Sequence, residues 1–227
     1  RALLVLYMTK SVEQGGFGWS KAEALSIYGW YTSLVYLTPV FGGYLADRFI
    51  GQKRAVLLGG VLMMLGHFLM AAPGQAAFFA ALALLVIGNG FFKPNISTQV
   101  GQLYGPDDSR RDRAFTIFYM GINTGALLAP YVCGTLGEKV GFHYGFASAG
   151  VGMLLGLVSY AIGAPILLKG IGDKPAAKLD KNAPADPSEL LTDDEKDRIR
   201  VIVILAIFTI FFWAAFEQAG GLMTLYT

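Results

Sequence analysis

Three charged residues lie inside apolar stretches of the sequence, where an unpaired charge costs several kcal/mol. They are Arg1, Lys93 and Glu217, among 18 basic and 16 acidic residues in the chain. Such residues usually face a water-filled cavity or an opposite charge, unless they reach the membrane surface from near a helix end. In a site of low dielectric, a guanidinium or an ammonium binds a carboxylate, and a glutamate whose basic partner leaves can take up a proton.

Two neutral polar residues, Tyr36 and Asn123, lie near the middle of other apolar stretches. Counting about 1.5 Å per helical residue from the nearest charges, Asp47 and Arg113, places both near mid-depth. A phenol and a carboxamide can bond to the N–H and C=O groups of many ligands. The plainer explanations are a packed aromatic ring for Tyr36 and a helix–helix hydrogen bond for Asn123.

The composition indicates what kind of protein must position these side chains. Hydrophobic residues make up 54% of the 227 residues and charged residues 15%, against about 25% charged residues in soluble domains. This apolar content excludes a disordered chain, and the net charge of +2 disfavours nucleic-acid binding. A single cysteine, Cys133, excludes a disulfide framework and a cysteine-rich zinc site. We therefore predict an all-α, polytopic membrane protein.

The uncharged stretches give the membrane spans, each of which needs about 20 apolar residues. They lack the alternation of a membrane β-barrel, and the Pro73-Gly74 pair divides the longest of them in two. We predict a partial helix at residues 1–9 and spans at 24–46, 55–72, 76–100, 114–135, 144–168 and 199–227.

The distribution of basic residues predicts the orientation. Basic residues cluster at 48–54 and 110–113, and seven more lie between Lys169 and Arg200. The opposite loops hold only three lysines. The basic side, and with it a missing N-terminus, is therefore expected in the cytoplasm.

The chain is expected to divide into three parts and to be a fragment of a longer protein. A proline-containing hydrophilic linker at 169–198 separates a helical bundle at 1–168 from a last helix at 199–227. Two sequences have the pattern of a capping box, SKAE at 20–23 and TDDE at 192–195, and each is expected to begin a helix.

The sequence GGYLADRFIGQKR at 42–54 resembles the motif between the second and third helices of the major facilitator superfamily. The resemblance implies that Asp47, Arg48, Lys53 and Arg54 form a cytoplasmic charge network that latches one conformation. The alternative is a basic turn with ordinary glycine packing.

Further segments resemble the proton-dependent oligopeptide transporter family. They are GNGFFKPNIS at 88–97, FYMGINTGALLAP at 118–130 and FFWAAFEQAGG at 211–221, with 42–66 matching that family's loop motif. The opening RALLVLYM resembles the first helix just after the family's ExxER element. The resemblance implies a six-helix facilitator bundle, a linker and a seventh helix, with the C-terminal half absent.

The resemblance also implies a function: symport of di- and tripeptides with protons across the cell (inner) membrane by alternating access, with the proton gradient in place of a cofactor. Arg1 and Lys93 then hold the peptide carboxylate, Tyr36 and Asn123 supply polar contacts, and Glu217 pairs with Arg1. Arg1, Lys93 and Glu217 are the groups expected to couple protons to opening.

The main alternative is a carrier of the same fold for nitrate, another anion or a sugar. An enzyme is disfavoured, because the sequence has no HExxH, no GxSxG and no paired cysteines or histidines. His67 is either a proton carrier or a buried structural residue. Pro94 is expected to break the helix beside Lys93, and Gly152 and Gly156 are expected to pack against another helix.

Overall fold

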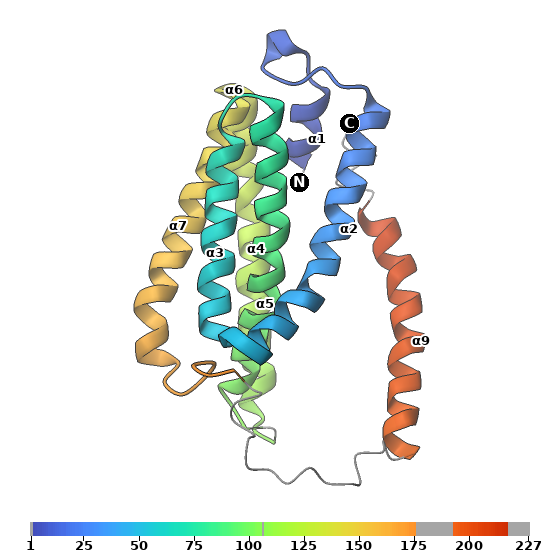
Figure 1. Cartoon of the computed structure of the whole chain (residues 1–227), viewed down its shortest axis with the longest axis vertical. Coiled ribbons are helices and arrows are strands. Elements are labelled where there is room, and N and C mark those ends of the chain that lie inside the picture. The colour runs from blue at the N-terminus through green and yellow to red at the C-terminus, as the bar shows by residue number, and fades with distance from the viewer. Residues whose placement is uncertain (1, 106, 176–192, 218–227) are drawn as a thin grey trace.

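The computed structural model describes residues 2–105, 107–175 and 193–217, and all regular structure within them is helical (Figure 1). The elements in chain order are α1 (Ala2–Thr9), η1 (Val12–Gln14), α2 (Lys21–Leu45), η2 (Ala46–Ile50), α3 (Gln52–Met70), α4 (Gln75–Gln102), α5 (Arg110–Ala129), η3 (Pro130–Gly134), α6 (Thr135–Lys139), α7 (Phe142–Leu167) and α9 (Asp193–Phe216).

Five of the described helical segments are long and apolar enough to cross a membrane. They contain α3, α4, α5 together with α6, α7, and α9 from Lys196 onward. The predicted break at the Pro73-Gly74 pair is confirmed, since α3 ends at Met70 and α4 begins at Gln75. The predicted span 24–46 corresponds to α2, which is long enough to cross a membrane. It is not among the five, because its four tyrosines lower its mean hydropathy. The chain is thus a multi-pass membrane protein.

Glycines set the distance between the central helices. A Cβ on Gly59 of α3 would lie 2.5 Å from the carbonyl oxygen of Gly88 on α4 and 2.7 Å from the backbone nitrogen of Phe92. A Cβ on Gly42 of α2 would collide with the backbone of Gly90 on α4. Backbone therefore meets backbone at both crossings, as small residues allow in membrane helices.

Two predictions about helix packing are wrong. A Cβ on Gly152 or Gly156 would meet no neighbouring atom of the described chain within 4 Å, so neither glycine is a packing contact in this part of the structure. Pro94 does not break α4, which continues to Gln102. The Pro94 ring faces Gly43 of α2, whose missing side chain leaves room for it.

A cluster of aromatic rings holds the short helix α1 in place. The ring of Tyr7 lies 4.7 Å from that of Phe17 and 5.2–5.3 Å from those of Phe142 and Phe146 on α7, measured between centroids. Tyr7 is 3% exposed. Its packing joins α1, the loop that follows it, and α7.

The predicted capping box at the start of α2 is confirmed. The Ser20 hydroxyl accepts a hydrogen bond from the Glu23 backbone N–H (3.2 Å), and the Glu23 carboxylate accepts one from the Ser20 N–H (3.0 Å). The pKa of Glu23 lies below its ordinary value because the Ser20 hydroxyl and N–H bond to it. In the predicted box at 192–195, the Thr192 and Glu195 side chains lie outside the described residues.

We predict that Gly59→Leu lowers the free energy of unfolding by about 1–3 kcal/mol or more, because the new side chain overlaps α4 backbone. Gly152→Leu, on the open side of α7, is the matched control and should change stability little. Thermal unfolding of both variants in detergent measures the difference, and equal midpoints would contradict the glycine crossing.

Candidate functional site

The carboxylate of Glu217 joins the end of α9 to α2. Its Oε1 accepts a hydrogen bond of 2.8 Å from the Tyr36 hydroxyl, and its Oε2 lies 3.4 Å from the hydroxyl of Tyr28. Both tyrosines lie on α2. A charged group predicted to lie deep in an apolar segment thus has polar partners on a neighbouring helix, as such groups require.

Tyr36 also faces the second predicted charge. The Lys93 ammonium of α4 lies 4.9 Å from the centroid of the Tyr36 ring, within the range of a cation–π interaction. The ring of Trp213 on α9 lies 6.4 Å from the Tyr36 ring. Lys93, Tyr36 and Glu217, predicted from separate segments of the sequence, are therefore brought together; we call them, with Tyr28 and Trp213, the tyrosine cluster.

Two hydrogen bonds between α2 and α4 fix the register that brings Tyr36 to Lys93. The Asn89 amide donates to the carbonyl oxygen of Val35 (2.8 Å), and the Thr38 hydroxyl donates to that of Val86 (2.9 Å). Val35 and Thr38 flank Tyr36 in the sequence. Together with the glycine crossings, these bonds place the ring beside the ammonium.

Tyr28 is the site residue that the sequence analysis missed. It is 5% exposed and lies eight residues before Tyr36 on the same helix. Residues i and i+8 lie within about 80° of each other around an α-helix, so they share a face. That spacing is the signal that would have identified it.

Asn123 and Arg1 are not joined to the tyrosine cluster by any described contact. Asn123 is exposed, and its amide donates to the carbonyl oxygen of Tyr119 one turn earlier on α5 (2.9 Å). Arg1 lies outside the described residues, so its predicted pairing with Glu217 stays a prediction.

Three of the four charges of the 42–54 motif have separate partners in the described residues. The Gln52 amide donates to Asp47 (3.4 Å), Arg48 donates to the Tyr44 hydroxyl (3.1 Å), and Lys53 pairs with Asp173 in the loop after α7 (2.6 Å). Within the described residues, no ion pair joins Asp47 to Arg48, Lys53 or Arg54. The expected network among these four residues is therefore not formed there.

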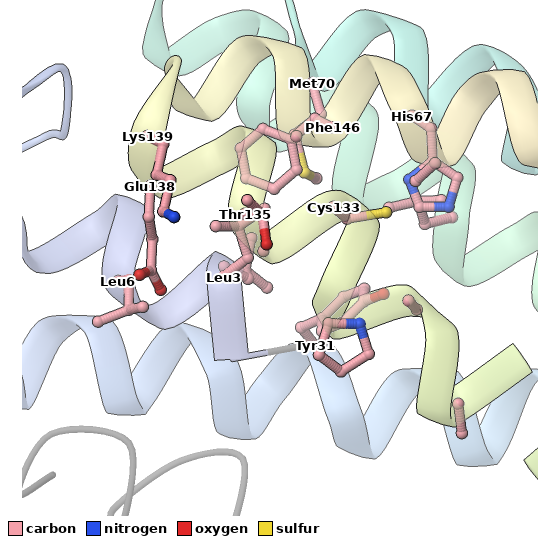
Figure 2. A pocket seen from close by; sticks show the side chains of 18 residues that line it. Leu3, Leu6, Tyr31, His67, Met70, Cys133, Thr135, Glu138, Lys139 and Phe146 are labelled. Atoms are coloured by element: carbon pink, nitrogen blue, oxygen red, sulfur yellow. The ribbon is translucent and has the colours of Figure 1, made fainter.

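A cavity of about 690 Å³ lies elsewhere, between α1, α3, α7 and the end of α5 with η3 and α6 (Figure 2). Its lining is mainly apolar, with Glu138 and Lys139 at one end and His67 beside Cys133 at the other. The buried Nδ1 of His67 has no hydrogen-bond partner in the described part of the chain. Lys93, Tyr36 and Glu217 do not line this cavity.

Metal binding has no support in the described ranges. Over residues 2–105, 107–175 and 193–217, no group of three or more His, Cys, Asp or Glu side chains is placed to hold a metal ion. The site's chemistry is that of an ammonium, a carboxylate and phenols.

Comparison with known proteins identifies relatives along most of the chain. The sequence model of the POT family (PTR2) matches residues 53–185. A di-/tripeptide transporter of Lactococcus lactis subsp. lactis is 42% identical over 214 residues, covering 93% of this chain and 41% of the relative. The uncharacterized transporter YclF of Bacillus subtilis is 48% identical over 71% of this chain and 33% of its own length.

Solved structures are similar as well. A crystal structure of a peptide transporter POT in complex with sulfate has a TM-score of 0.76 and 43% identity, over 97% of this chain and 42% of that one. A POT family transporter in complex with 5-aminolevulinic acid has a TM-score of 0.74 and 34% identity, over 96% of this chain and 43% of that one. The chain thus spans about two fifths of the length of these two structures.

We predict that Tyr36 and Glu217 are energetically coupled. In a double-mutant cycle of Tyr36→Phe and Glu217→Gln, unfolding in detergent should give a coupling of about 1 kcal/mol, at the lower end for a charged hydrogen bond because Tyr36 is 41% exposed. Tyr119→Phe, whose hydroxyl bonds to no described residue, is the control and should show no coupling to Glu217. Additivity in the Tyr36 cycle would contradict the contact.

Proposed function

Because this chain belongs to the POT family, we propose that it forms the first half of a carrier that moves di- and tripeptides with protons across the cytoplasmic membrane. The relative named as a di-/tripeptide transporter supports this choice of substrate. The single observation that carries the proposal is the convergence of Lys93 and Glu217 on Tyr36 from α4, α9 and α2.

The tyrosine cluster has the groups that a peptide terminus requires. The Lys93 ammonium is a cation for the peptide carboxylate, and its cation–π contact with Tyr36 is weak enough to exchange for a ligand. Phenol hydroxyls donate and accept, so they bind peptide N–H and C=O groups whatever the side chains. Contacts to the backbone rather than to side chains would let one site accept many sequences.

Glu217 is the proposed proton carrier. In the described residues its carboxylate is held by hydroxyl donors, which stabilise the charged form. We propose that Arg1, which lies outside the described residues, is its cationic partner, and that a substrate carboxylate drawing Arg1 away allows Glu217 to take up a proton. Proton uptake would then accompany opening of the site.

The second half of the same transporter is the proposed partner. The chain spans 33–41% of the length of the curated relatives cited above, and α9 would be the first helix of that second half. Alternating access would then move the carboxylate on α9 relative to Tyr36 on α2. The basic ends of the helices and the segment at 169–198 would face the cytoplasm.

We predict that Glu217→Gln, made in the full-length transporter, abolishes uptake driven by a pH gradient while sparing exchange of peptide for peptide, because the amide cannot carry a proton but keeps a hydrogen-bond acceptor. The measurement is labelled dipeptide uptake into proteoliposomes, with Asp193→Asn at the start of α9 as the control. Undiminished gradient-driven accumulation in Glu217→Gln would end the assignment of Glu217.

We predict that Lys93→Gln raises the half-saturating dipeptide concentration by about 10- to 100-fold, the cost of losing a charged hydrogen bond. Lys10→Gln, an exposed cation of the first loop, is the control. Competition of the same uptake by unlabelled dipeptides, nitrate and sugars identifies the substrate. Competition by nitrate or a sugar but not by peptides would replace peptide transport with the alternative carrier function.

A further inference from the structure

The loop after α7 folds back onto the beginning of α3. The Lys53 ammonium lies 2.6 Å from Asp173 Oδ1, and the Lys53 backbone N–H donates to the carbonyl oxygen of Gly172 (3.0 Å). Asp173 Oδ2 accepts a further bond from the backbone N–H of Gly170 (3.0 Å). Figure 1 shows this loop, in orange, at the end of the bundle where α2 meets α3. The Asp173 side chain thus bonds both to the backbone of its own loop and to Lys53 of α3.

The ion pair is more than two solvated surface charges. The Lys53 side chain is only 14% exposed, whereas that of Asp173 is 50% exposed. An ion pair between fully exposed groups contributes little, but Asp173 supplies the only described anion for an ammonium that is largely out of water. The hydrogen bond from Lys53 holds the pKa of the Asp173 carboxyl below its ordinary value.

The loop rests on side chains from two helices, α3 and α4. Gly172 has φ +66°, and a Cβ on it would lie 3.0 Å from the Gln52 Cβ of α3 and 3.2 Å from the Gln99 Nε2 of α4. Gln99 is 1% exposed, and its Oε1 accepts a 2.7 Å hydrogen bond from the Tyr160 hydroxyl of α7. The loop therefore packs closely against the start of α3 and the last turn of α4, where Tyr160 of α7 holds Gln99 in place.

We propose that residues 170–174, with Lys53, form a clip that fastens the start of the linker to the α2–α3 turn. The tether between the two halves then begins at Pro175 rather than at the end of α7. Releasing the six residues between Leu168 and Pro175 would lengthen the tether by up to roughly 20 Å at the reach of an extended chain. The clip is a conformational device that limits how far the second half can move from the turn formed by η2.

In the clip, Lys53 makes a contact within one half of the protein. The network implied by the facilitator motif would instead use Lys53 together with Asp47. In the structure, the Gln52 amide donates a hydrogen bond to Asp47, and Lys53 forms an ion pair with Asp173. The effect of the clip on transport rests on the proposed function, but its effect on local order does not.

Hydrogen–deuterium exchange of the full-length protein tests the clip directly. Lys53→Gln and Asp173→Asn should each raise exchange of the 168–174 backbone amides about fivefold, the effect of losing a partly exposed pair. Exchanging the charges, Lys53→Asp with Asp173→Lys, should restore only part of the protection, because a lysine at position 173 cannot accept the bond from the Gly170 N–H. Lys174→Gln, a neighbouring cation outside the pair, is the control. Unchanged exchange in both single variants would overturn the proposal.

A pair of glycine variants separates the clip's packing from its charge. Gly170 and Gly172 both have positive φ, but a Cβ on Gly170 would meet no atom within 4 Å. Gly172→Val should therefore raise exchange more than Gly170→Val, since both carry backbone strain and only one collides with Gln52 and Gln99. Equal exchange in the two would count against the packed loop.

Transport gives the second readout. If the clip limits movement of the second half, the Lys53→Gln and Asp173→Asn variants should change the turnover number for dipeptide uptake by the same factor and leave the half-saturating concentration unchanged. If amide exchange in the loop rises but the turnover number for dipeptide uptake is unchanged, the clip has no role in transport. A protein that carries no peptide would refute the proposed function and leave the exchange experiment intact.

Discussion

Tyr36 is the residue on which the candidate site depends, because its side chain contacts two charged groups of opposite sign. Its hydroxyl donates to Glu217, and its ring faces the Lys93 ammonium. A phenol is suited to this because its polar edge and its π-face point in different directions. Each charge is thereby stabilised by Tyr36, and within the described residues no ion pair joins Lys93 to Glu217.

That arrangement requires a close approach of α2 and α4. The collision that a Cβ on Gly42 would make with Gly90 shows that the helix backbones touch there. The bonds from Asn89 and Thr38 then set the register along the helices. Since lipid supplies no hydrophobic force between apolar helices, backbone contact and hydrogen bonds must hold the crossing. The site and the packing of the bundle are thus one structural feature.

The start of α3 and the loop after α7 carry charges of another kind. Lys53 and Asp173 lie at the boundary of the bundle, where water is near and the pair is only partly buried. The 42–54 motif therefore contributes contacts within the bundle, from Asp47 to Gln52 and from Lys53 to the loop after α7. The charged residues thus fall into those that hold the end of the bundle together and those that meet at Tyr36.

Local chemistry determined much of this protein from the sequence alone. The apolar runs, the Pro73-Gly74 break and the Ser20 capping box predicted where helices begin and end, because helix termini depend on neighbouring residues. The cost of burying charge identified Lys93 and Glu217 as exceptional. Only the tertiary structure decided which groups meet. Gly59 packs against α4, whereas Gly152 faces no neighbouring atom in the described part of the chain. Pro94 is accommodated by Gly43, Tyr28 joins Glu217, and Lys53 pairs with Asp173. Those contacts depend on how helices cross, and a helical repeat gives the face of each residue but not the helix that covers it.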